Sequence, residues 1–336
     1  MTKKPTAPAG PPSDDETREA LEKSGYPLEV KLFKRLQDRG FDPTIGHRFT
    51  VGDGSSEVDL VARRRTEPHS YTNEDGTRRT ATASMVALME VKNLPANTRM
   101  VGVRSTETPS PRAMRALRGK MLGIPAWHTH REVPDPRNQL TDLLAPDEGL
   151  GAAFDVIGGP LCVHWAKVYF KKEGSNHVPW ACGDDRWREQ VDRLVRVSEM
   201  MMRDHTEREL EFQATRQNGL LGMTFHTLVL VIQTPHGLGL YDAETRSFSN
   251  HDWLTYRRVF DVGAGELSTR VVEIVTSDAG FTMLLDAMER AADVLDEGLA
   301  NHLPILTEAA DAQLAWWRAH SLQEEAHELD PGGIFR

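Results

Sequence analysis

The sequence predicts an α/β (α+β) fold in which helices flank a mixed central β-sheet. Two short segments, residues 57–62 and 87–92, alternate apolar and charged side chains, as half-buried strands do. Two longer stretches, residues 27–36 and 184–217, repeat apolar residues at helical spacing. Additional C-terminal strands and helices are expected. Apolar runs predict further strands at residues 161–170, 225–233 and 270–276.

Size and composition fit a soluble globular protein with polar ends. The chain has 336 residues, of which 39% are hydrophobic and 27% charged, enough for one large domain or two ordinary ones. No apolar run approaches the length of a membrane span, and no apolar segment follows the basic start, so no membrane partner is expected. The two cysteines argue against a disulfide framework and for a reducing, cytoplasmic location.

Four segments are predicted along the chain. Residues 1–16 are rich in Pro, Lys and Asp and are expected to be a disordered tail. Residues 17–172 are expected to form the core, with a basic hairpin and a loop insertion. Residues 173–325 would form a helical and α/β extension packed on that core, and residues 326–336 a second tail.

The core begins with a helix followed by three strands. Pro27 marks the first turn of the helix, and Gly40 provides its C-terminal stop. The helix has an apolar stripe formed by Leu28, Leu32, Phe33 and Leu36. A strand at Thr44–Val51 precedes the two alternating segments, which gives an α-β-β-β order. The strand at 161–170 is expected to be the next one in the core sheet.

Three charged side chains of the two alternating segments are predicted to share one sheet face. Glu90 and Lys92 are two residues apart on a strand and so lie about 7 Å apart on the same side. A hairpin turn centred on residues 74–75 would place Asp59 opposite Glu90, whereas a turn on residues 75–76 would place it opposite Lys92. Either register brings the three together.

Two carboxylates beside an ammonium group suit the hydrolysis of phosphodiester bonds. Hard oxygen ligands favour Mg²⁺, with Mn²⁺ as a substitute, and the bound ion can activate a water. Asp59 and Glu90 would bind this metal, joined by the backbone carbonyl of Val91, which lies between two site residues. Lys92 would orient or deprotonate the attacking water, or offset charge at the phosphate.

Asp59 followed, after a hairpin, by Glu90-Val91-Lys92 resembles the D…(D/E)-x-K signature of the PD-(D/E)XK nuclease superfamily, which has the restriction-endonuclease-like fold. Residues 24–36 resemble the first helix of that fold, which often carries an extra acidic residue facing the site. Glu29 is that candidate and would assist as an outer ligand or base. The resemblance covers residues 24–93 well and continues loosely to the strand near 161–170. It implies a Mg²⁺-dependent endonuclease acting on DNA, of bacterial origin, in restriction, defence or repair.

The charge distribution is compatible with a nucleic-acid substrate despite a net charge of −10. Residues 61–131 contain 13 Lys and Arg against 5 Asp and Glu, although a solvated surface would also explain this. The candidate DNA contacts are Arg63, Arg64, Arg65, Arg78, Arg79, Arg112 and Arg115.

Several alternatives remain open at this stage. The chain could be a catalytically degenerate nuclease fold that serves as a DNA-binding or protein-interaction subunit, or its substrate could be RNA. A final helix with Trp316-Trp317 leaves room for a homodimer or a protein partner. The cysteine and histidine spacing is atypical of a structural zinc site. Its candidate ligands are Cys162, His164, His177 and Cys182.

Overall fold

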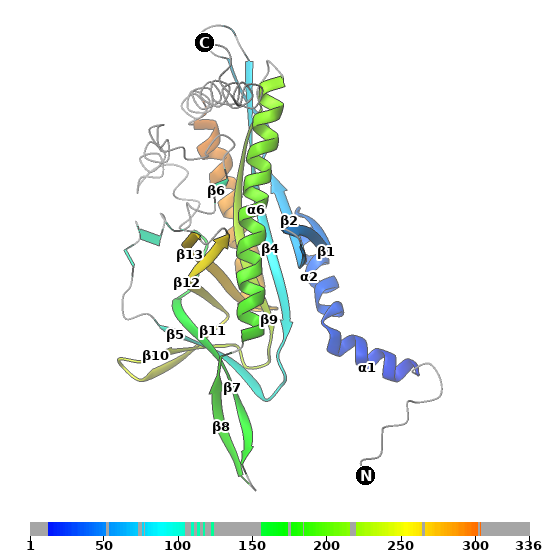
Figure 1. The fold of residues 1–336 in the computed structure, drawn as a ribbon, viewed down its shortest axis with the longest axis vertical. Helices are drawn as coiled ribbons and strands as arrows, with labels where there is room; N and C mark the ends of the chain where they lie inside the picture. Colours follow the sequence, from blue (N-terminus) through cyan, green and yellow to red (C-terminus); the bar gives the residue numbers. More distant parts are fainter. Residues whose placement is uncertain are drawn as a thin grey trace, which may run out of the picture.

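A mixed β-sheet forms the centre of the protein, with helices covering both faces (Figure 1). The computed structural model describes residues 13–51, 54–72, 76, 78–104, 109–110, 113–114, 117, 122–123, 156–173, 176–183, 185–215, 220–263, 266–301 and 303. The predicted arginine contacts at 112 and 115, the tryptophan pair at 316–317 and the tail at 326–336 lie outside these residues.

Within the described residues, the sheet contains 13 strands. Three helices are labelled in Figure 1 as α1, α2 and α6. The strands are β1 (Asp42–Val51), β2 (Gly54–Arg65), β3 (His69–Thr72), β4 (Arg78–Asn93), β5 (Thr98–Arg104), β6 (Leu122–Gly123), β7 (Leu161–Glu173), β8 (Asn176–Cys182), β9 (Leu220–Gln233), β10 (Leu238–Asp242), β11 (Ser247–His251), β12 (Trp253–Gly263) and β13 (Glu266–Thr276). The helices are α1 (Asp14–Ser24), α2 (Tyr26–Asp38) and α6 (Asp185–Thr215), and residues 279–301 are also helical.

The sheet combines an antiparallel meander with a parallel crossover. Its order is β1-β2-β4-β9-β13-β12-β7-β5-β10-β11, with β3, β6 and β8 attached beside this path. Strands β1, β2 and β4 are antiparallel neighbours, while β9 runs parallel to β4 from Thr80↔Leu220 to Asn93↔Gln233. A parallel neighbour requires a crossover connection, and α6 lies in that connection.

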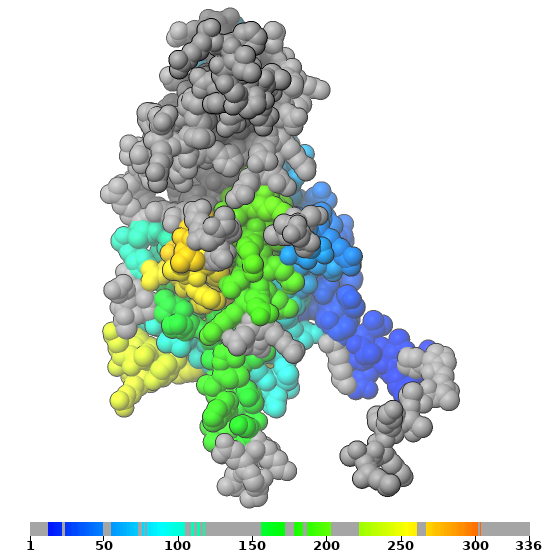
Figure 2. Space-filling model, viewed as in Figure 1, coloured from blue at the N-terminus to red at the C-terminus, as the bar shows by residue number. Residues whose placement is uncertain are grey.

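Helix α6 covers one face of the sheet and crosses the front of the molecule in Figure 2. Its Ser198 Oγ lies 2.7 Å from Nδ1 of the buried His226 on β9, and its Glu199 accepts a 2.7 Å hydrogen bond from Nε of Arg270 on β13. Side chains alternate along a strand, and even-numbered residues of β4 pair with even-numbered residues of β9. The even-numbered residues of both strands therefore lie on the face that α6 covers.

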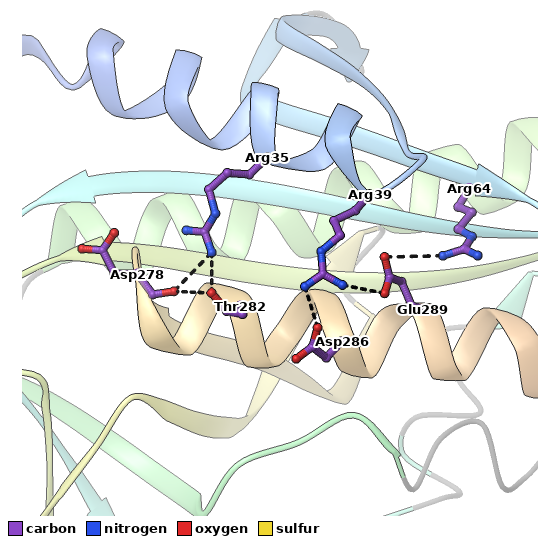
Figure 3. Close-up of polar contacts among 7 residues, drawn as sticks. All are labelled: Arg35, Arg39, Arg64, Asp278, Thr282, Asp286 and Glu289. Carbon is purple, nitrogen blue, oxygen red and sulfur yellow. Dashed lines mark hydrogen bonds and ion pairs between the residues drawn. The ribbon is translucent and has the colours of Figure 1, made fainter.

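The opposite face is covered by α2 and the 279–301 helix, which are joined by arginines (Figure 3). Arg35 donates hydrogen bonds to the Ser277 carbonyl at 2.7 Å and to Thr282 Oγ1 at 2.5 Å. Arg39 pairs at 2.8 Å with each of two carboxylates. Arg64 on β2 lies within 4 Å of one of them. We call this group the α2 seam; its members are Arg35, Arg39, Arg64, Asp278, Thr282, Asp286 and Glu289.

The N-terminal helices agree with the predicted apolar stripe but begin earlier than the sequence predicts. Leu28, Leu32 and Leu36 are buried, as the helical stripe predicts. Residue 14, however, already begins α1, so the end of the predicted tail at 1–16 is helical. A capping box at Ser13, whose hydroxyl and backbone N–H pair with Glu16, starts this helix.

Three features of the sheet differ from the predicted organisation. Strand β7 was expected beside the site hairpin, but it pairs with β5, β8 and β12, and β9 is the strand next to β4. Strand β5 forms within the stretch expected to be a loop insertion. The sheet also continues across the predicted boundary at residue 172, since β9 lies at its centre. None of the described helices is long and apolar enough to cross a membrane.

Candidate active site

The candidate site lies where β2 and β4 begin to separate. Their ladder runs in one register from Arg65↔Ser84 to Leu60↔Met89, and the next step of that register places Asp59 opposite Glu90. This is one of the two registers that the hairpin turn predicts. Just beyond the last pair, the Asp59 carboxylate accepts the Val91 N–H, with Oδ2 2.8 Å from the nitrogen.

Lys92 connects the two carboxylates. Its Nζ lies 2.9 Å from Glu90 Oε2 and 3.4 Å from Asp59 Oδ2. Both contacts are made by side chains that are mostly buried, with 18% of the Lys92 side chain and 23% of the Asp59 side chain exposed. The three predicted site residues therefore converge on one point at the end of β4.

Glu90 is the most deeply buried member of this cluster, since only 1% of its side chain is exposed. Burial raises its pKa above the ordinary carboxyl value, and the neighbouring Asp59 raises it further. The positive charges of Lys92 and Arg193 act in the opposite direction without cancelling these effects. The fold therefore holds an acidic group at a place that disfavours its ionised form.

Arg193 of α6 is a site residue that the sequence analysis missed. Its Nη2 lies 3.2 Å from Glu90 Oε1, so the two oxygens of this carboxylate contact different cations. Residue 193 lies within a long amphipathic helix, where charged side chains are common, and its partner is 103 positions away. The only sequence signal was the helix itself.

Glu29 on α2 lies next to the site, near Asn93 at the end of β4. A Cβ atom placed on Gly25 would lie 3.8 Å from Glu29 Oε1 and 3.9 Å from Asn93 Nδ2, so both side chains lie beside this glycine. Gly25 has a φ of 90° and joins α1 to α2, which favours glycine there. Burial, followed by the charge of Asp59, raises the pKa of Glu29.

Buried polar atoms without hydrogen-bond partners occur at and next to this cluster. They include Asn93 Oδ1, adjacent to Lys92 in sequence, and Arg193 Nε, beside Glu90. A third is Gln190 Oε1, one helical turn before Arg193 on α6. Such atoms are costly in a folded protein unless a water, an ion or a ligand satisfies them.

The donor set at this position consists of hard oxygen atoms. Asp59 and Glu90 contribute carboxylates that contact the same ammonium nitrogen. The Val91 N–H points toward β2, and the carbonyl of a strand residue points to the same side as its N–H. Within the described part of the chain, no group of three or more His, Cys, Asp or Glu side chains is arranged to hold a metal. Mg²⁺ usually keeps several waters and binds one or two carboxylates, so two carboxylates and one carbonyl could hold it without further protein ligands.

The predicted DNA-binding arginines lie away from this cluster. Arg65 is six residues from Asp59 along β2, or about 20 Å, and Arg78 is twelve residues from Glu90 along β4, or about 40 Å. Arg64 takes part in the α2 seam, and Arg63 is half-buried, with a pKa lowered mainly by burial. The structure describes the backbone of Arg79 but not its side chain.

The candidate zinc ligands are not brought together. Cys182 pairs with Lys167, and Cys162 lies five residues from Lys167 along β7, or about 16 Å. Cys162 is buried, and burial together with the nearby Glu273 raises the pKa of its thiol to about 12. His164 is exposed on β7, and the side chain of His177 lies outside the described residues.

Comparisons with family models, with curated proteins and with solved structures gave no match for this chain.

Proposed function

We propose that the protein is a metal-dependent nuclease that hydrolyses phosphodiester bonds in DNA, with Mg²⁺ as its cofactor and Mn²⁺ as a substitute. The observation that carries this proposal is the convergence of Asp59, Glu90 and Lys92 at the end of β4. If β3 and β5–β8 are set aside as insertions, the remaining order α2-β1-β2-β4-α6-β9, with β9 parallel to β4, is compatible with the core of the PD-(D/E)XK nucleases that the sequence resembles.

The site residues have distinct roles in this reaction. Asp59, Glu90 and the Val91 carbonyl would hold the ion, which supplies a water of lowered pKa and offsets negative charge on the phosphate. Lys92 would then turn from the carboxylates to orient the attacking water and offset charge at the phosphate, and the proton of that water would pass to the Glu29 carboxylate or to solvent. A water oxygen bonds to phosphorus as the ester P–O bond breaks, and the leaving oxygen takes a proton from solvent.

Arg193 and Glu29 support these groups. Arg193 fixes Oε1 of Glu90, which leaves Oε2 directed at the position now held by the Lys92 ammonium. Arg193 is therefore a positioning residue, with a guanidinium that remains partly exposed to an incoming phosphate. Glu29 lies next to the site and is a candidate for an outer-sphere base, because its raised pKa brings proton exchange closer to neutral pH.

The test is cleavage of supercoiled plasmid, linear duplex, single-stranded DNA and RNA, with Mg²⁺, Mn²⁺ or EDTA. We expect metal-dependent cutting of DNA that is lost in Lys92→Ala and kept in Lys31→Ala. Lys31 is a matched control because it lies on α2 in an exposed ion pair with Asp278.

Two results would contradict the proposal. DNA binding without cutting in either metal would favour the alternative, a binding subunit with a degenerate nuclease fold. Cutting that persists at full rate in Lys92→Ala would mean that the catalytic site lies elsewhere. A preference for RNA would keep the chemistry and change the polymer.

A further inference from the structure

Gly46 interrupts β1 at the position opposite Asp59. The β1–β2 ladder pairs Ile45 with Leu60, and the next step of the same register places Gly46 across from Asp59. The φ of Gly46, 62°, lies in the left-handed region, which favours glycine and is unusual within a strand. A glycine inside a strand often marks a place where a ligand approaches the backbone closely. At this position β1 therefore presents no side chain beside the Asp59 carboxylate.

The gap at Gly46 lies on an outer strand of the sheet. Within the described residues, β1 forms one end of the strand order and pairs with β2 alone. A Cβ atom placed on Gly46 would lie 3.5 Å from Oε1 of Glu57, which shares a face with Asp59 because the two are two residues apart on β2. The Asp59 side chain itself is 23% exposed. An extended ligand can therefore reach this carboxylate across the edge of the sheet.

Arg48 lies on the same face, one step further along this edge. It is the ladder partner of Glu57, and it lies about 7 Å along β1 from the position opposite Asp59. Its Nε donates a 2.9 Å hydrogen bond to Glu57 Oε2, and 78% of its side chain is exposed. Among the described contacts of Arg48, this bond uses Nε alone, which leaves the two forked terminal nitrogens for a second acceptor. The guanidinium is thus close to the site and accessible.

We propose that Arg48 binds a phosphate of the DNA strand next to the phosphate that is hydrolysed, and that the strand crosses the edge of the sheet at Gly46. This inference rests on the proposed nuclease function and specifies its substrate as a polynucleotide chain, not a single small phosphodiester. Guanidinium groups bind phosphate through two parallel hydrogen bonds. Because Arg193 contacts Glu90 on β4, cations lie on both sides of Asp59, an arrangement that suits a ligand with several phosphates.

Glu57 allows the inference to be tested in two directions. Its carboxylate holds Arg48 in the absence of substrate and would repel an incoming phosphate. Exposed ion pairs contribute little stability, so a phosphate can displace Glu57 from the guanidinium. Removing Arg48 should therefore weaken the binding of DNA, whereas neutralising Glu57 should strengthen it as long as Arg48 is present.

The experiment measures binding of a fluorescein-labelled oligonucleotide and of its duplex by anisotropy, in the Lys92→Ala background with Mg²⁺. We expect Arg48→Gln to weaken binding roughly fivefold to tenfold and to reduce the slope of log affinity against log salt by about 0.7 to 0.9. Glu57→Gln should tighten binding severalfold, and most of this gain should be absent when Arg48→Gln is also present. The exposed pair of Arg18 and Asp15 on α1 is the matched control, since Arg18→Gln and Asp15→Asn should bind as the parent does.

Two further comparisons test the position of the strand. In the otherwise wild-type enzyme, Arg48→Gln should lower kcat/KM for DNA far more than for bis(p-nitrophenyl) phosphate, a phosphodiester without a neighbouring phosphate, whereas a purely structural residue would lower both equally. In the anisotropy assay, Gly46→Leu should weaken DNA binding about tenfold, because its side chain would stand beside Asp59. Gly40→Leu is the control, since Gly40 also has a left-handed φ, 74°, and open space around it.

The outcomes separate this inference from the nuclease proposal. Equal DNA binding by Arg48→Gln and Arg18→Gln, or no DNA binding by the parent, would overturn the inference even if the wild type cuts DNA. Equal binding by Gly46→Leu and Gly40→Leu would also overturn it. Arg48-dependent binding by a wild type that does not cut would keep the phosphate site and refute the nuclease. Thermal unfolding shows whether a loss reflects misfolding, and the gain expected in Glu57→Gln cannot arise from misfolding.

Discussion

Among the described residues, the α2 seam and the candidate site are both clusters of ion pairs, and the contrast between them shows how differently the fold treats the same kinds of side chain. In the α2 seam, Arg39 meets two carboxylates that are partly exposed, with 43% of the Asp286 side chain accessible. In the candidate site, Glu90 is almost fully buried and meets two cations. The same residue types therefore occur in two very different environments.

The two clusters differ in whether their own ion pairs satisfy the charged groups that they contain. The hydrogen bonds of Asp286 and Glu289 raise the pKa of Arg39, so the seam favours the charged form of its arginine. The site instead raises the pKa of Glu90 and leaves Arg193 Nε without a partner. In the site, a further cation would stabilise the ionised form of Glu90, which its surroundings disfavour. In the seam, the neighbouring carboxylates already stabilise the charged form of Arg39.

The largest expected effect comes from neutralising the buried carboxylate. Glu90→Gln should reduce metal-dependent cleavage by roughly 10²- to 10⁴-fold, because one metal ligand loses its charge. The unfolding free energy without metal should not fall at pH 8, since the ionised form is the disfavoured one. Cleavage rates and denaturant unfolding check both expectations, and Arg39→Gln in the seam is the matched control, with unchanged cleavage. Loss of stability in Glu90→Gln together with normal cleavage would reverse the assignment of the two clusters.

Removing Arg193 should have the next largest effect. We expect Arg193→Gln to lower cleavage roughly 10- to 100-fold, because Glu90 loses the contact that orients it. Arg193 also lowers the pKa of Glu90, so its loss should move the acid limb of the pH–rate profile to higher pH. A purely structural residue would reduce the rate without moving this limb. Arg193→Lys should restore part of both properties.

The pH dependence of metal binding tests the raised pKa directly. Because the folded-state pKa of Glu90 is raised, its stabilising contribution is present below the ordinary carboxyl pKa and is lost as pH rises through the raised value. Mg²⁺ requires the ionised form, so its affinity should increase over the same interval. Calorimetric titrations with Mg²⁺ across this pH range, compared between wild type and Glu90→Gln, measure the difference. An affinity that is constant down to the ordinary carboxyl pKa would contradict it.

The smallest effect is expected in the seam. Arg39→Ala should lower the unfolding free energy by about 1 kcal/mol, because partly exposed pairs are screened by solvent. The loss should shrink at high salt, while Mg²⁺ affinity stays the same. Urea denaturation at low and high ionic strength provides this comparison. A seam variant that changes Mg²⁺ affinity would show that α2 couples the two clusters.

Local sequence was sufficient to predict the convergence of three site residues. Alternation along β4 fixes Glu90 and Lys92 on one face, and the length of the hairpin limits Asp59 to two registers. The structure has the register in which Asp59 lies opposite Glu90. The helix carrying Glu29 was predictable because its apolar stripe has a clear helical period.

Contacts between distant segments were not predictable in the same way. The identity of the strand beside β4 depends on which of several apolar runs the crossover connection reaches, and both β7 and β9 have suitable sequences. Arg193 belongs to the site only because α6 lies across β9 and β4, a relation that no local pattern encodes. The α1 cap at Ser13 was local but was missed because the surrounding segment is so polar.

The pairing of β4 with β9 also has a consequence for when the site forms. Every paired residue in this ladder meets a partner 140 positions later, as Thr80 does with Leu220. Contacts of such separation form late, because a long intervening chain must be ordered before they close. During synthesis, the strand bearing Glu90 and Lys92 remains an unpaired edge on this side until β9 has left the ribosome. The chain therefore assembles its candidate site only after most of it has been made, which delays any hydrolytic activity until the sheet is complete.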